Sequence, residues 1–103
     1  MDPERLARDT VASVLEWQPR PEDGVVVESA EVVQVAGDGP GVVVLWNQVT
    51  REQGARRFGV LLSVAAFSGV DVDALVRTLL HMLRGPHATP ADAQTRTWYA
   101  QLG

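Results

Sequence analysis

Residues 42–46 read Val-Val-Val-Leu-Trp, and this run decides the fold class. β-Branched and aromatic residues favour extended backbone, and glycine and proline stand directly before the run. We therefore expect a strand that continues to about Val49. Because both alternating sets of the run are apolar, neither face of this strand is built for water.

Two similar runs flank the central one, and short turn-forming segments separate all three. The first strand is expected over 25–36, with a bulge or bend near residues 28–31, where the alternation is imperfect. The third strand is expected over 57–66, where the alternation is regular. The glycine-rich segment 37–41 and the segment 50–55, which contains Gly54, are typical of hairpin connections, so the sequence predicts a three-stranded antiparallel meander.

Helical periodicity precedes and follows the three strands. Asp2, followed by Pro3, can cap a first helix that ends before Pro19, with an apolar stripe that includes Leu15. Asp71 can cap a second helix that ends at Gly85-Pro86. The segment Thr89-Pro90-Ala91-Asp92 has the features of a third helix start. We therefore expect one α+β domain over residues 1–103, with the order α-β-β-β-α-α and helices packed on the sheet.

Composition excludes several classes of protein. The chain has 103 residues, no cysteine and a formal net charge of −4, so thiolate metal sites and disulfides are excluded and a general nucleic-acid binder is disfavoured. The longest apolar stretch has the length of a strand, and the first residues lack the basic-then-apolar pattern of a secretory signal. We expect a cytoplasmic protein that is not associated with a membrane.

The sheet has more apolar surface than one layer of helices can cover. One face receives the first two helices, and the other still presents apolar side chains from the second and third strands. The residues expected on this second face are Val43, Leu45, Leu61 and Ala65. We expect a second copy of the chain, in a homodimer, or another protein to cover them. The alternative is cover by the chain's own last helix, through Trp98, Tyr99 and Leu102.

No motif in the chain carries recognisable catalytic chemistry. His81 and His87 have no metal-ligand partner at a diagnostic offset, so we expect no metal, no cofactor and no catalytic residue. The expected function is that of a non-catalytic interaction, adaptor or regulatory module that acts through its apolar sheet face or an edge.

Two alternative functions stay open. A small-molecule site or minimal enzyme would use a pocket between sheet and helix, lined by Trp46, Asn47, Glu28 and Glu31. RNA binding would use a basic patch at the second hairpin, formed by Arg51, Arg56 and Arg57. The order helix, three strands, helix is similar to that of double-stranded RNA-binding domains, but the second helix opens with Asp71 and Asp73, which would repel phosphates.

Overall fold

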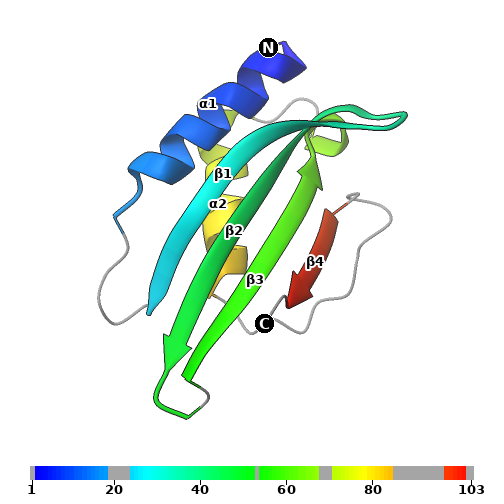
Figure 1. The fold of residues 1–103 in the computed structure, drawn as a ribbon. Helices are drawn as coiled ribbons and strands as arrows, with labels where there is room; N and C mark the ends of the chain where they lie inside the picture. The colour runs from blue at the N-terminus through cyan, green and yellow to red at the C-terminus, as the bar shows by residue number, and fades with distance from the viewer. Residues whose placement is uncertain (1, 19–23, 53, 68–70, 85–96, 102–103) are drawn as a thin grey trace.

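The computed structural model describes residues 2–18, 24–52, 54–67, 71–84 and 97–101. Two helices lie against one face of an antiparallel sheet whose strand order is β1-β2-β3-β4 (Figure 1). The elements in chain order are α1 (Pro3–Glu16), β1 (Val25–Val35), β2 (Gly39–Thr50), β3 (Gly54–Ser63), the 3-10 helix η2 (Val64–Phe67), α2 (Val72–Arg84) and β4 (Thr97–Gln101). The predicted α+β class, the first two helices and the three-stranded meander are confirmed.

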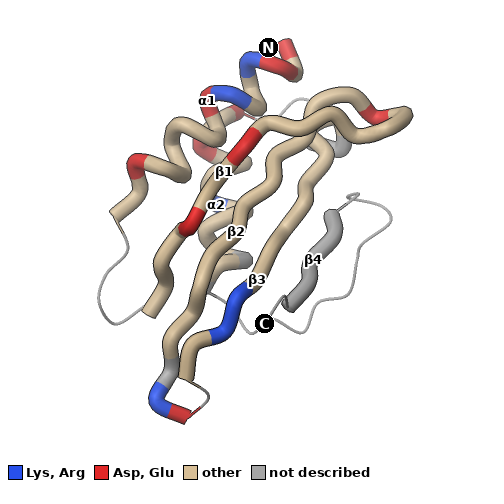
Figure 2. The backbone as a smooth tube through the Cα atoms, in the orientation of Figure 1, with Lys and Arg blue, Asp and Glu red and all other residues tan. Residues whose placement is uncertain are grey.

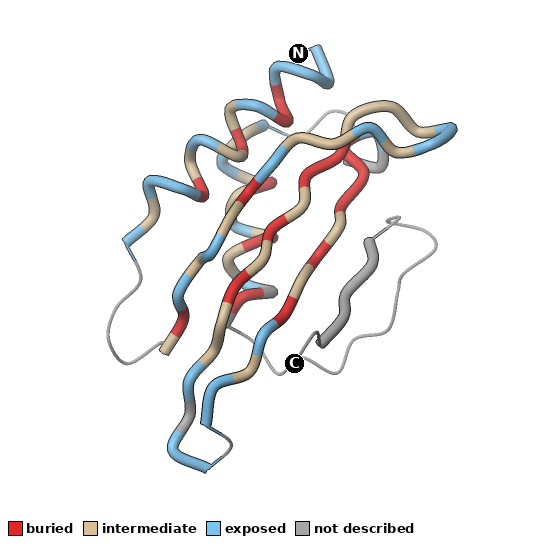
Figure 3. The backbone as a smooth tube through the Cα atoms, in the orientation of Figure 1, coloured by how far each residue is buried: buried red, intermediate tan, exposed pale blue. Residues whose placement is uncertain are grey.

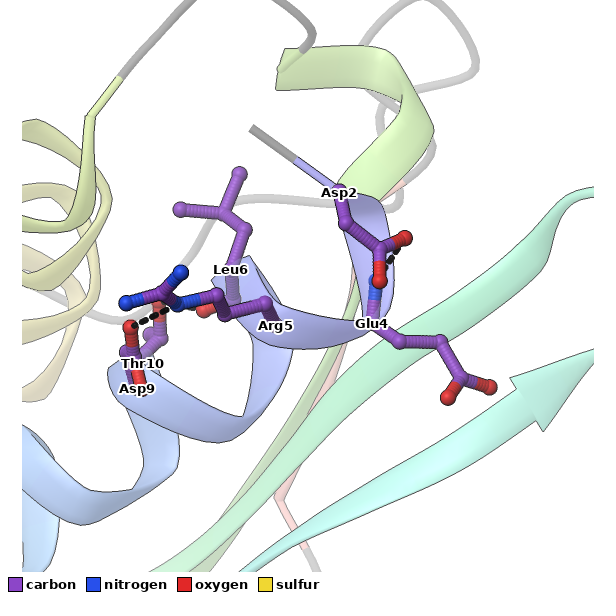
Figure 4. A network of polar contacts seen from close by, with 6 residues as sticks. All are labelled: Asp2, Glu4, Arg5, Leu6, Asp9 and Thr10. Carbon is purple, nitrogen blue, oxygen red and sulfur yellow. Dashed lines mark hydrogen bonds and ion pairs between the residues drawn. The ribbon is translucent and has the colours of Figure 1, made fainter.

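The helix α1 is capped as its sequence predicts. Figure 4 shows the Asp2 carboxylate oxygen Oδ1 accepting a hydrogen bond from the backbone N–H of Glu4, at 3.3 Å. Further along the helix, the buried Thr10 hydroxyl donates to the carbonyl of Leu6 at 2.6 Å, which satisfies a polar group in an apolar layer. The stripe is narrower than predicted, since Leu15 is 55% exposed.

The helix α2 packs a row of leucines beneath the sheet. Asp71 Oδ1 accepts from the backbone N–H of Ala74 at 2.8 Å, which fixes the first turn of the helix. Leu75, Leu79 and Leu83 recur at helical spacing and are fully buried. Neither helix of the described residues is long and apolar enough to cross a bilayer.

The core lies between the helices and one set of alternating strand positions. Val42, Val44 and Trp46 of β2 are fully buried there, and the Trp46 ring stacks on Phe58 of β3 with centroids 5.7 Å apart. Figure 3 shows the regular alternation of buried and partly buried positions along β2 and β3. The predicted bulge is confirmed in β1, where the register with β2 shifts between Val27 and Ser29.

The C-terminal prediction is wrong. Residues 97–101 form the strand β4, which pairs antiparallel with β3 and places Trp98 opposite Leu61 in the register. The predicted helix start at 89–92, together with His87 and Leu102, lies outside the described residues. In the described part of the chain, β4 therefore widens the sheet beside β3, and no third helix lies over its second face.

The third strand also differs from its prediction. β3 begins at Gly54, three residues earlier than expected, and ends at Ser63. Val64–Phe67 then turns into η2, so Val64 remains in the core while Ala65 is exposed on a helical turn. The strand prediction failed because alternation in a short apolar run does not show where the backbone leaves the sheet.

Candidate functional site

The sheet face that looks away from α1 and α2 is the principal candidate, and we call it the open face. Neighbouring residues along a strand point to opposite sides of the sheet. The residues that alternate with the buried ones, such as Val42, Val44 and Trp46, therefore lie on the open face. It comprises Val26, Glu28, Ser29 and Glu31 of β1, Val43, Leu45, Asn47 and Val49 of β2, and Arg57, Gly59 and Leu61 of β3. Among the described residues, no helix covers it (Figure 1).

The open face has an apolar middle. Val43, Leu45 and Leu61 are partly exposed, although each would be a core residue in a sheet covered on both sides. Val26 and Val49 extend this apolar surface towards one end of the sheet, where they are 59% and 54% exposed. Single exposed apolar residues are ordinary, whereas neighbouring ones such as Val43, Leu45 and Leu61 form the kind of apolar patch that is typical of an interaction surface.

Three polar side chains interrupt the apolar surface. Asn47 Nδ2 donates to Glu28 Oε1 at 2.5 Å, and Arg57 Nε donates to Glu28 Oε2 at 3.1 Å. Arg57 Nη2 also lies 3.0 Å from Glu28 Oε2, which completes an ion pair. We call these residues the polar trio. It joins β1 to β3 across β2, and its two charged side chains remain 31% (Glu28) and 48% (Arg57) exposed.

Charge on the open face is distributed by strand. Figure 2 shows acidic positions along β1 and basic positions on β3, with β2 uncharged between them over 42–49. The acidic residues that belong to the open face are Glu28 and Glu31, and the basic one is Arg57. The face therefore has a negative side on β1 and a positive side on β3, with the uncharged positions Val43, Leu45, Asn47 and Val49 of β2 between them.

The predicted interaction residues are brought together with one exception. The register places Val43 directly opposite Leu61, and Leu45 lies on the same face two positions along β2. Ala65 is separated from them, because the chain has already turned into η2. Ala65 therefore does not lie on the sheet face that the regular alternation of the third strand predicted.

The predicted ligand pocket is not assembled. Trp46 points into the helix-covered core and is fully buried, whereas Asn47 and Glu28 meet on the open face. Glu31 lies beside Val43 in the register and is exposed. The physical reason is the two-residue period of a strand, which sends Trp46 and Asn47 to opposite sides of the sheet.

The predicted basic patch is divided in the same way. Arg56 pairs with Gln48 in the register and Arg57 with Asn47, so the two arginines point to opposite faces. Arg57 is in addition neutralised by Glu28. Arg51 is exposed at the tip of the β2–β3 hairpin, next to Glu52, so these residues do not build a continuous cationic surface.

A separate hollow lies beside the two helices, away from the open face. It is shallow, has a volume of about 400 Å³, and is lined by Ser13, Asp71, Asp73, Val76 and Arg77. Asp71 already caps α2. His81 is exposed on α2, and in the described ranges no three histidine or carboxylate side chains gather as metal ligands would.

Sequence reasoning missed two parts of the open face. Val26 and Val49 are not among the residues expected there, and Val26 reaches this face only through the register shift between Val27 and Ser29, since the unshifted hairpin register would place Val27 opposite Asn47. The ion pair between Glu28 and Arg57 was also missed, because residues 29 positions apart meet only through the three-strand register and the bulge.

Comparisons with models of protein families, with curated proteins and with solved structures each returned no match for this chain.

Proposed function

We propose that this protein is a non-catalytic interaction module and that it associates with a second copy of itself through the open face. The supporting observation is the partly exposed apolar surface formed by Val43, Leu45 and Leu61 on a sheet whose other face packs against the two helices (Figure 1). An adaptor or regulatory role would follow from this association.

The free energy available from covering the open face is large for a domain of this size. Full burial of a valine or leucine side chain contributes about 1.5–3 kcal/mol. Val26 and Val49 are more than half exposed, so most of their contribution is still to be gained. Association would bury these side chains on both copies and would gain part of their burial free energy twice. It would lose translational and rotational entropy only once.

The face is a better association surface than the β1 edge. A long flat edge strand can accept another strand through its free N–H and C=O groups. In β1 the bulge at Glu28 breaks the regular edge, and α1 packs against the strand. A bulge and charged side chains are devices that discourage pairing at an edge.

A second copy suits the face because the face carries both signs of charge. Glu28 and Glu31 lie on β1 and Arg57 lies on β3, so two copies in opposed orientation can present acid to base. A partner surface with only positive or only negative charge would be complementary to only one side of the open face. Most soluble oligomers are closed assemblies of identical chains, and the two-fold dimer is the commonest.

The test is the mass in solution of the full chain and of two variants. Wild type should show about twice the 11.2 kDa of one chain in light scattering at tens of micromolar. Leu45→Glu should show the mass of a single chain, because it places a charge in the apolar middle of the interface. Circular dichroism should be unchanged, since Leu45 lies outside the helix-covered core.

Leu15→Glu is the matched control. Leu15 is 55% exposed on α1, away from the open face, so the same substitution there should leave the dimer intact. A wild-type protein that stays monomeric at these concentrations would refute the proposal. The same holds if Leu45→Glu remains folded and dimeric.

A further inference from the structure

The polar trio has a geometry that selects between two ways of stacking the open faces. The following inference rests on the self-association proposed above. We propose that the trio is an orientation determinant, and that it favours a dimer whose two-fold axis runs parallel to β2. In that dimer the β1 side of each copy lies over the β3 side of its partner.

The trio is a fixed electric dipole on the open face. Its negative end is the Glu28 carboxylate, which comes from β1, and its positive end is the Arg57 guanidinium, which comes from β3. Asn47 holds Glu28 from the strand between them, so the carboxylate is bound from two sides. The dipole therefore points across the strands in a direction that the fold sets.

A two-fold axis that relates two stacked faces must lie between them and parallel to both. If it runs along β2, it exchanges the β1 and β3 sides and brings each Glu28 towards the partner's Arg57. The two dipoles are then antiparallel, which is the attractive arrangement. If the axis runs across the strands at the level of the trio, Glu28 comes to lie over Glu28 and Arg57 over Arg57, and like charges repel as water leaves the interface.

The apolar residues that β2 contributes to the open face also agree with the axis along β2. Val43, Leu45 and Val49 all belong to β2, so each would lie near its own counterpart in the partner. Stacked sheets keep their strands within about 30° of each other, which preserves this match along the strand. With the axis across the strands at Asn47, the two copies of Val43 would lie about 27 Å apart, given roughly 3.3–3.4 Å per residue.

The absence of cysteine from the chain makes the arrangement directly measurable. Single variants Val43→Cys, Leu45→Cys and Val49→Cys would each be treated with a short bis-maleimide, because stacked sheets are about 10 Å apart and exceed the reach of a disulfide. We expect all three variants to give covalent dimers. Leu15→Cys on α1 is the control and should remain uncrosslinked.

Charge reversal supplies the second readout. Glu28→Arg and Arg57→Glu should each weaken dimerisation at least tenfold in sedimentation equilibrium, since each places like charges opposite one another. The double variant Glu28→Arg/Arg57→Glu should recover an affinity within about threefold of wild type, because it reverses both dipoles together. Both ends of the trio are partly exposed, so the fold should tolerate these changes.

The outcomes separate this inference from the proposed function. A wild-type dimer in which Val43→Cys and Val49→Cys do not crosslink would overturn the orientation and leave self-association standing. A dimer whose affinity is unchanged by either single charge reversal would overturn it as well. A monomeric wild type would instead remove the proposed function, and this inference with it.

Discussion

Gly24 is a residue whose side chain the fold excludes for two reasons. Its φ of +63° lies in the left-handed region, which costs other residues about 1–2 kcal/mol. A Cβ built there would also clash with the backbone carbonyl oxygen of Val49. The Gly24 carbonyl in turn accepts a hydrogen bond from the Val49 N–H at 2.8 Å, so the two strands are held close at this point.

Gly24→Ala should therefore destabilise the protein by about 3 kcal/mol, the sum of backbone strain and overpacking. Gly37→Ala is the matched control, because Gly37 has a similar φ of +82° but open space around it. Gly37→Ala should reduce the folding free energy by about 1–2 kcal/mol, through the strain of the positive φ alone. Urea denaturation of both variants measures the difference. Equal losses would show that the contact with Val49 contributes nothing.

Single residues also show where the sequence was sufficient and where it was not. The sequence predicts that the run at 42–46 is a strand with apolar residues on both sides, but it does not decide that Val42, Val44 and Trp46 are the set that faces the core. The ligand pocket failed at the same strand because it joined Trp46 and Asn47, which the period separates. The Glu28–Arg57 pair could not be predicted, since a one-residue bulge changes which side chains meet.

At the scale of elements, the two helices differ in how firmly their first turns are fixed. The cap at α2 is a 2.8 Å hydrogen bond from the Ala74 N–H to Asp71 Oδ1, whereas the cap at α1 is a longer bond of 3.3 Å to Asp2. α2 carries three fully buried leucines, so fraying of its first turn disturbs the core directly.

Asp71→Ala should cost about 1 kcal/mol of folding free energy, within the range of about 0.5–2 kcal/mol for removal of an N-cap. Asp2→Ala should cost clearly less, because its bond is long and the end of α1 is exposed. Chemical denaturation of the two variants measures which of them loses more folding free energy. The account of the caps would be wrong if Asp2→Ala proved the more damaging change.

The C-terminal element shows the limit of local reasoning. A cap, a proline and an acid at 89–92 predict a helix, and these are properties of neighbouring residues only. β4 depends on a partner more than thirty residues away, since Val60 pairs with Tyr99 and Leu62 with Thr97. An unpaired β3 edge is a tertiary feature that no local window contains, and such features override propensity.

At the scale of the whole molecule, the asymmetry of the sheet sets the behaviour in solution. One face packs both helices, and the open face retains partly exposed valine and leucine side chains among the described residues. The sequence predicted this imbalance from the run at 42–46, because both alternating sets there are apolar. It did not predict the division of charge between β1 and β3, which gives the face a direction.

If association through the open face stabilises the folded state, the melting temperature must depend on protein concentration. A partner that binds only the folded chain adds about 2.7 kcal/mol when its concentration exceeds the dissociation constant 100-fold, and this gain is shared by the two copies of a dimer. For a chain of about 100 residues, 1 kcal/mol shifts the melting temperature by roughly 4–8 °C. A rise from about 1 to about 100 μM should therefore raise the wild-type value by roughly 5–10 °C, as long as the dimer predominates over that range. Differential scanning calorimetry across these concentrations measures the shift.

Leu45→Glu should have the same melting temperature at every concentration, because its folded state is a monomer. A wild-type melting temperature as constant as that of the variant would mean that the open face is stable in water on its own.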